Sequence, residues 1–195
     1  MAAETRQKIL DAANERVLRS GYPATTVDEI CETAGVSKGS FYHFFRTKEE
    51  MGLGLLAGFY EDFQHRVLGA SWSQEIEPEV RLLGFLAHTE ENAEALWGEG
   101  CLLGGLALDV AETNETMQQR ISTILGSLEQ SLVPIFEPAA TADGLSAEDL
   151  AELWLSVVEG SIVLATGHQD PARISRGLAT FRNQVERLLE FSSQA

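Results

Sequence analysis

The sequence has little cysteine and no long apolar run, and both absences limit the kind of protein it can be. Its two cysteines, Cys31 and Cys101, lie far apart, which excludes a disulfide framework and suits a reducing compartment. No apolar stretch approaches the roughly 20 residues that cross a bilayer. The N-terminal MAAETRQKILDAANERV has the pattern of an amphipathic helix and lacks the apolar region of a secretion signal. We therefore expect a cytoplasmic protein with no membrane partner.

Motifs for catalysis and metal binding are also missing. The sequence contains no HExxH, CxxC, P-loop or nucleophile elbow. Its four histidines, His43, His65, His88 and His168, show no ligand spacing. We therefore expect no enzymatic activity, no metal and no cofactor.

Positive charge is scarce, with 14 Lys and Arg residues against 30 Asp and Glu residues and a net charge of −16. The imbalance is uneven along the chain. Residues 1–50 carry seven basic and eight acidic groups, a net charge of −1, whereas residues 51–195 carry seven and twenty-two, a net charge of −15. Because local charge governs contact with phosphate, the acidity of the whole chain does not exclude a nucleic-acid partner for the first fifty residues.

Apolar residues recur with helical spacing along nearly the whole chain, and the two-residue alternation of strands is absent. The pattern predicts an all-α protein of about nine helices. Their expected ranges are 5–20, 27–34, 38–45, 48–69, 77–95, 101–112, 115–137, 147–167 and 171–191.

Residues 26–50 have the layout of a helix-turn-helix. Thr26-Val-Asp-Glu29 is a capping box that opens one helix, Gly35 is suited to end it, and Ser37 is suited to cap the next. On a helical wheel, the phenylalanines of SKGSFYHFF, Phe41, Phe44 and Phe45, share one side. Gly39 and His43 lie at the centre of the opposite side, edged by Lys38, Ser40 and Tyr42. In such a motif the second helix enters the major groove of DNA.

Glycine at the centre of an exposed helical face lowers helix stability by about 1 kcal/mol relative to alanine. That loss is understandable if a large partner such as DNA must approach the backbone there. The alternative reading is a small helical subdomain whose polar face is simply solvated, because aromatic stripes at helical spacing usually mark a core.

The run TTVDEICETAGVSKGSFYHFF, with the ILDAA helix before it and KEE after it, resembles the N-terminal domain of the TetR family of bacterial transcriptional repressors. The resemblance implies a three-helix DNA-binding domain over residues 1–48 and a helical ligand-binding and dimerisation domain over residues 49–195. It also implies a homodimer that leaves a pseudo-palindromic double-stranded DNA operator, and with it the nucleoid, when a small-molecule inducer binds. The DNA contacts carried over by matching motif positions are Thr26, Ser37, Lys38, Gly39, Ser40, Tyr42, His43 and Lys48. The rival function is a helical dimer that binds a protein partner without specific DNA binding.

The last two expected helices carry apolar seams suited to a dimer. In the final helix, successive apolar residues are spaced by 4, 3, 4 and 3 positions, which is the spacing of a coiled coil. The alternative is that both helices bury an intramolecular core. The residues expected at a four-helix dimer interface are Trp154, Val158, Ile162, Ile174, Leu178, Phe181, Val185 and Leu188.

The stretch WGEGCLLGGLALDVAE, residues 97–112, places Cys101 among four glycines at the start of an apolar helix. It resembles a Gly-Cys-Leu-x-Gly segment beside the effector pocket of a subset of TetR-type regulators, some of which respond to small unsaturated or electrophilic compounds. An apolar or electrophilic effector is therefore expected, and the alternative for Cys101 is an inert buried thiol. Family layout and aromatic content give the candidate pocket residues Phe59, Phe63, Phe85, His88, Trp97, Cys101, Leu102 and Trp154.

Overall fold

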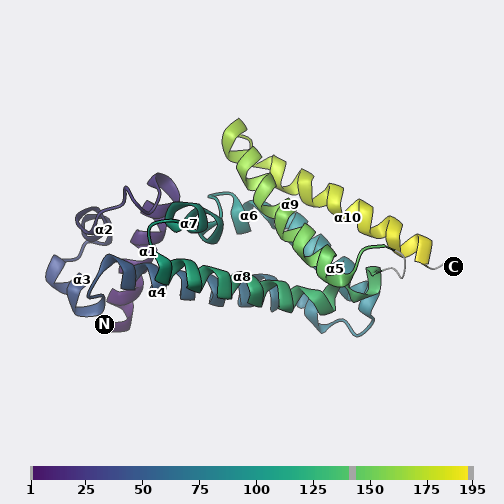
Figure 1. Ribbon diagram of the computed structural model, residues 1–195, viewed down its shortest axis with the longest axis horizontal. Helices are drawn as coiled ribbons and strands as arrows, with labels where there is room; N and C mark the ends of the chain where they lie inside the picture. Colours follow the sequence, from purple (N-terminus) through teal and green to yellow (C-terminus); the bar gives the residue numbers. More distant parts are fainter. Residues whose placement is uncertain (1, 141–143, 193–195) are drawn as a thin grey trace. The chain divides into compact units, whose positions relative to one another are not determined.

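The structure is a computed structural model that describes residues 2–140 and 144–192. The fold in these ranges is built from helices. No strand occurs in these ranges, which confirms the expected all-α class (Figure 1). The α-helices are α1 (Ala2–Ser20), α2 (Val27–Ala34), α3 (Lys38–Phe44), α4 (Lys48–Phe63), α5 (Pro78–Glu91), α6 (Ala93–Trp97), α7 (Leu102–Val110), α8 (Glu115–Phe136), α9 (Ala147–His168) and α10 (Ala172–Ser192). A π-helical turn, Gln64–Leu68, and two 3₁₀ turns, Ser71–Gln74 and Glu137–Ala139, complete them.

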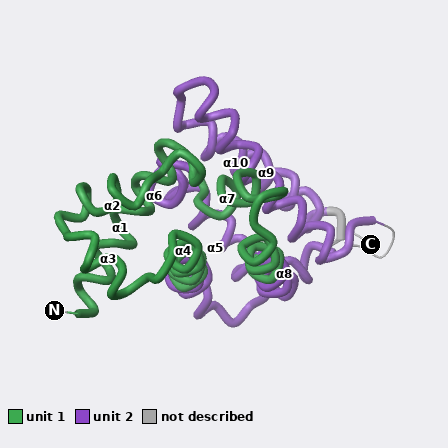
Figure 2. Tube along the Cα trace, turned by 60° about the vertical axis from the view of Figure 1, so that its left-hand side comes forward, with its two compact units in different colours: residues 1–61, 101–124 green, residues 62–100, 125–195 purple. Residues whose placement is uncertain are grey.

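The chain divides into two compact units, which Figure 2 distinguishes by colour. Unit 1 comprises residues 1–61 and 101–124, and unit 2 comprises residues 62–100 and 125–195. The expected boundary at residues 48 and 49 therefore differs from the division by contacts, because α7 and parts of α4 and α8 belong with the helix-turn-helix region.

Unit 1 is organised around the buried face of α1, which packs against α2, α3 and α7. Ile9, Ala13 and Val17 lie on that face at helical spacing and are buried. The first turns of α4 add the buried Met51 and Leu55.

Unit 2 is built on α5, α9 and α10, with α10 packed against both of the other helices. An aromatic cluster fills its core: the Phe85 ring lies 4.9 Å from that of Trp154, 5.2 Å from that of Trp72 and 5.9 Å from that of Phe136. The Trp154 ring also lies 6.1 Å from that of Trp97. By length and composition alone, α9 could cross a membrane, but it presents a buried face to this core.

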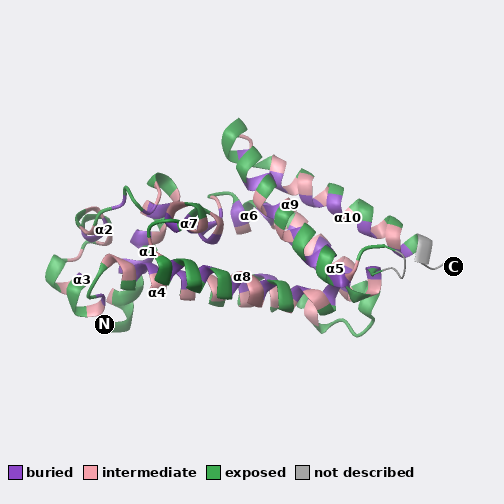
Figure 3. Ribbon diagram, viewed as in Figure 1, coloured by how far each residue is buried: buried purple, intermediate pink, exposed green. Residues whose placement is uncertain are grey.

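The residues expected at the dimer seam lie in this core instead. Figure 3, coloured by burial, shows buried segments along both α9 and α10. Those buried within the single chain are Trp154, Val158, Ile162, Ile174, Leu178, Phe181 and Val185, while Leu188 is half-buried. The apolar spacing thus marks an intramolecular core, the alternative reading of the pattern. The exposed apolar side chains of α9 are Leu153, Val163 and Leu164.

One expected helix proves to be two. The range 77–95 is broken at Asn92, which separates α5 from α6. The Asn92 side-chain amide donates to the His88 carbonyl at 2.8 Å, and the Asn92 backbone N–H reaches the same carbonyl at 3.1 Å. This side-chain amide competes for the backbone, as asparagine commonly does, and the chain turns there.

Candidate nucleic-acid interface

The turn between α2 and α3 is fixed by local sequence chemistry. Thr26 caps α2: its hydroxyl accepts from the Glu29 backbone N–H at 3.3 Å, and the Glu29 carboxylate accepts from the Thr26 N–H at 2.9 Å. The helix ends on Gly35, whose φ of 65° is left-handed, and the Val36 N–H then bonds the Cys31 carbonyl at 3.0 Å. This closed pattern is a Schellman-type end, so α2 needs no outside group to terminate.

Helix α3 separates an anchoring face from a polar face. Ser37 caps it, accepting from the Ser40 N–H at 3.1 Å. Phe41 and Phe45 are 0% and 2% exposed, with ring centroids 5.7 Å apart. Phe44, expected to be equally buried, is only half-buried. The two inner rings therefore hold this seven-residue helix, which could not persist alone.

The opposite face of α3 is open. Lys38, Gly39, Tyr42 and His43 are exposed, and Ser40 is half-buried. A Cβ added to Gly39 would meet only the Ser37 hydroxyl, at 3.6 Å. Packing within the chain does not demand glycine at this position, so the residue keeps the backbone accessible from outside.

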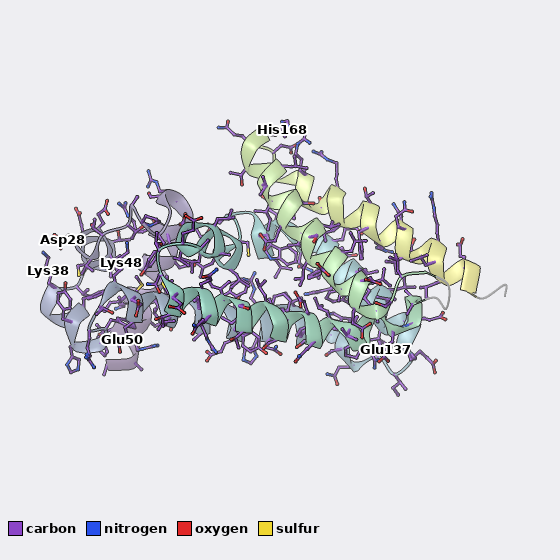
Figure 4. All side chains as sticks on the ribbon, viewed as in Figure 1. Asp28, Lys38, Lys48, Glu50, Glu137 and His168 are labelled. Atoms are coloured by element: carbon purple, nitrogen blue, oxygen red, sulfur yellow. The ribbon has the colours of Figure 1, made fainter. Side chains whose placement is uncertain are left out.

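The two lysines expected at the interface differ in their surroundings (Figure 4). Lys38 is an exposed cation whose Nζ lies 2.6 Å from the Asp28 carboxylate of α2, and this hydrogen bond raises the pKa of Lys38. Lys48 is half-buried: its Nζ donates to the Tyr22 carbonyl and lies 4.2 Å from the centroid of the Tyr22 ring. Burial lowers the pKa of Lys48, and the charge of Asp109 opposes that shift. Lys48 thus acts first as a brace for the turn after α1.

Hydrogen bonds already occupy part of the Thr26 side chain. Its hydroxyl donates to the Glu29 carboxylate at 2.8 Å, and Glu29 also pairs with Arg16 of α1. The hydrogen bond from the Thr26 backbone N–H is the main reason that the pKa of Glu29 is lowered. Thr26, Ser37, Lys38, Gly39, Ser40, Tyr42, His43 and Lys48 all lie on α2–α4 or their caps in unit 1.

The candidate effector residues are divided between the units. Phe59, Cys101 and Leu102 belong to unit 1, and Phe63, Phe85, His88, Trp97 and Trp154 belong to unit 2. Within unit 2, Phe85, Trp97 and Trp154 form part of the aromatic core. His88 has a structural contact, because its Nε2 lies 2.8 Å from the Arg66 carbonyl oxygen. A groove of about 570 Å³ in the same unit lies at the start of α5, beside Glu137, and includes none of these residues.

Cys101 is the N-cap of α7, and its Sγ accepts from the Gly104 N–H at 3.4 Å. The thiol is buried, 9% exposed, and follows Gly100, whose φ of 113° requires a glycine-like conformation. Cys101 therefore lies at the start of a helix, as the sequence pattern predicts, and its side chain caps that helix.

A residue that the sequence analysis missed is Asp109, whose carboxylate accepts from the Tyr22 N–H at 2.7 Å. A signal existed: Asp109 is the single charged residue in the run CLLGGLALDV, residues 101–110. A lone carboxylate in such a helix generally has a partner, but the sequence does not indicate which one.

A short helix anchored by aromatic rings and exposing cations, hydroxyls and bare backbone defines a class, that of helix-turn-helix DNA-binding regulators. Residues 9–53 match the family model of bacterial regulatory proteins of the tetR family, and residues 82–177 match the C-terminal domain model of LmrA/YxaF-like transcriptional regulators. The chain therefore belongs to the TetR family, whose members are ligand-responsive transcriptional regulators and not enzymes.

Similar proteins support this membership over the whole chain. The transcriptional regulator AcuR of Cereibacter sphaeroides is 30% identical over 97% of this chain and 89% of its own length. The repressor DhaR of a Mycobacterium species is 25% identical over 81% and 80%. A crystal structure of a regulatory protein TetR from Rhodobacter sphaeroides has a TM-score of 0.78 at 28% identity, covering 91% of this chain and 96% of that one.

Proposed function

We propose that this chain acts in the cytoplasm as a homodimeric repressor whose α3 helices read a pseudo-palindromic operator, and that a small apolar or electrophilic molecule releases it. The observation that carries the proposal is the division of α3 into a buried aromatic face and an open polar face. TetR-family regulators bind DNA operators and small-molecule effectors and act as dimers.

The groups on the open face suit a duplex. Lys38 can exchange Asp28 for a phosphate, because a surface ion pair of this kind contributes only about 0–1 kcal/mol. Tyr42 and His43 can donate hydrogen bonds to phosphate or base edges. The exposed Gly39 allows the backbone of α3 to approach the groove. In a dimer, two such helices would read half-sites about 34–36 Å apart.

Homodimerisation is supported by the exposed apolar residues of α9. Leu153, Val163 and Leu164 are 44%, 65% and 54% exposed, and Gly160 has no atom within 4 Å of an added Cβ. Small and apolar surface residues along one long helix suit close contact with a second copy. These exposed residues of α9 are therefore proposed as the dimer interface, in place of the apolar residues of α9 and α10 that are buried within the chain.

DNA binding is tested by selecting duplexes from a random-sequence library with the wild-type protein and measuring their retention in a mobility-shift assay. Tyr42→Ala and Lys38→Ala are expected to weaken binding, and affinity should fall steeply with salt. His168→Ala, which removes an exposed residue of unit 2, is the control. A wild-type protein that enriches no sequence even at low salt would favour the protein-interaction function instead.

The electrophilic effector is tested with N-ethylmaleimide on the protein–duplex complex. We expect the reagent to release wild-type protein but not Cys101→Ala. Cys31→Ala is the matched control, because burial raises the pKa of the Cys31 thiol and keeps it in its less reactive form. Equal release of the wild type and Cys101→Ala would exclude a role for this thiol.

A further inference from the structure

The helices α1 and α2 both end on a left-handed glycine, but only after α2 does the N–H of the residue that follows the glycine bond back to the helix. After α2, the Val36 N–H bonds the Cys31 carbonyl of the same helix. After α1, Gly21 has a φ of 80° and its N–H bonds the Val17 carbonyl at 2.8 Å. The next N–H, that of Tyr22, donates instead to the Asp109 carboxylate at 2.7 Å. The first residue beyond the end of α1 therefore depends on a side chain of α7, 87 positions away in the sequence.

The turn held in this way leads directly into the DNA-reading motif. Tyr22 is 9% exposed, and a buried N–H needs a partner. The carbonyl of Tyr22 accepts from Lys48 of α4, and Thr25, 1% exposed, donates its hydroxyl to the Gly21 carbonyl at 2.8 Å. The following residue, Thr26, caps α2. The geometry of residues 21–25 thus sets where α2 begins and where the Lys48 ammonium lies.

The corner between α7 and α8 makes a second connection to the start of α4. The Asn114 side chain donates to the Glu49 carboxylate at 2.7 Å. Close by, an added Cβ at Gly52 would lie 2.8 Å from the Met117 methyl carbon. These contacts lie within unit 1 and join α7 and α8 to the same region that Asp109 holds. The other end of α7 is capped by Cys101.

We propose that Asp109 is a positioning residue for DNA binding. Its carboxylate keeps the turn 21–25 in the geometry from which α2, α3 and Lys48 present their DNA-facing groups. The seat of α7 on α1 thereby sets the affinity for the duplex. This inference rests on the proposed function, because it takes α3 as the reading helix.

The test compares Asp109→Ala, Asp109→Asn and the control Glu112→Ala, an exposed carboxylate three residues further on. Binding to a duplex selected by the wild-type protein is expected to weaken about tenfold in Asp109→Ala, because the buried Tyr22 N–H loses its acceptor. Asp109→Asn keeps an acceptor oxygen and should recover most of the affinity. Glu112→Ala should bind as the wild type does.

Amide hydrogen exchange distinguishes positioning from general loss of stability. In Asp109→Ala the Tyr22 amide should exchange about tenfold faster, whereas the Ile9 amide in the middle of α1 should not change. Equal acceleration at both amides would overturn the inference. Should Asp109→Ala not fold, Asp109→Glu keeps the charge but displaces the carboxylate, and unchanged duplex affinity in that variant would overturn the inference as well.

A double-mutant cycle with Lys48→Ala tests the route through the turn. If both side chains act on residues 21–25, the effect of Asp109→Ala on affinity should shrink at least threefold in the Lys48→Ala background, whereas independent effects would add. Strict additivity contradicts the inference. Failure of the wild type to select any duplex would refute the proposed function itself, while equal binding by the wild type and Asp109→Ala would refute only the role of Asp109.

Discussion

The substitution Phe41→Ala tests whether the buried ring of Phe41 holds α3 in the fold. The side chain is 0% exposed, and its ring lies 5.7 Å from that of Phe45 and 5.3 Å from that of Tyr42. Burial of such a side chain contributes about 1.5–3 kcal/mol, and a favourable aromatic pair adds about 0.5–1.5 kcal/mol. Together with the cavity left behind, Phe41→Ala should lower the free energy of unfolding by about 3–5 kcal/mol.

The neighbouring residue provides a matched control. Tyr42 is 52% exposed, so Tyr42→Ala should lose little beyond its aromatic pair with Phe41 and lower the free energy of unfolding by about 0.5–1.5 kcal/mol. The same substitution removes a donor from the open face of α3 and should weaken binding to a selected duplex. Phe41→Ala is therefore expected to lower mainly the stability of the fold, and Tyr42→Ala mainly the affinity for DNA.

Urea denaturation followed by circular dichroism, at one fixed protein concentration, measures the first effect, and a mobility-shift assay measures the second. With a slope of about 2–3 kcal/mol per molar urea, Phe41→Ala should shift the midpoint by roughly 1 M or more. If Tyr42→Ala shifts the midpoint as far as Phe41→Ala does, the division of α3 into two faces is refuted.

Three further predictions concern unit 1. Gly52→Ala should lower stability by about 1 kcal/mol, because the new Cβ would lie 2.8 Å from the methyl end of the buried Met117. Gly58 has open space around it, so Gly58→Ala should raise stability by up to about 1 kcal/mol. Equal melting temperatures of the two variants in thermal unfolding would contradict this difference. Ser37→Ala should cost about 1 kcal/mol in urea unfolding by removing the cap on α3, and Ser37→Asp should restore most of it. The pKa of Glu29 is lowered in the fold, so the stability that its carboxylate contributes is complete above the unfolded-state pKa and is lost as pH falls through the folded-state pKa. Glu29→Gln should therefore flatten the loss of stability between about pH 5 and pH 3. An acid-unfolding profile identical to that of the wild type would count against this role of Glu29.

The reading motif could be predicted from sequence because its determinants are local. The Thr26 capping box, the left-handed Gly35 and the Ser37 cap each act within about four residues. Helical periodicity then placed Phe41 and Phe45 inside and His43 outside, which the burial of these residues confirms. Local chemistry of this kind leaves few alternatives.

Contacts between distant segments could not be predicted in the same way. That Lys48 contacts DNA stays a prediction, whereas its hydrogen bond to the Tyr22 carbonyl depends on how α4 packs beside the end of α1, which sequence spacing does not reveal. The bond between Asp109 and Tyr22 spans 87 residues. Periodicity in α9 and α10 identified a buried face correctly, but spacing alone does not say whether the same chain or a second copy covers it. The structure shows that α5, α9 and α10 cover it together.

The aromatic residues are divided between the two units in a way that gives each its own optical signal. All three tryptophans, Trp72, Trp97 and Trp154, lie in unit 2, whereas all three tyrosines, Tyr22, Tyr42 and Tyr60, lie in unit 1. Light absorbed by indole alone therefore produces emission from unit 2, and phenol absorption originates in unit 1. A ligand titration and a DNA titration can each be followed in the natural protein without attaching a dye.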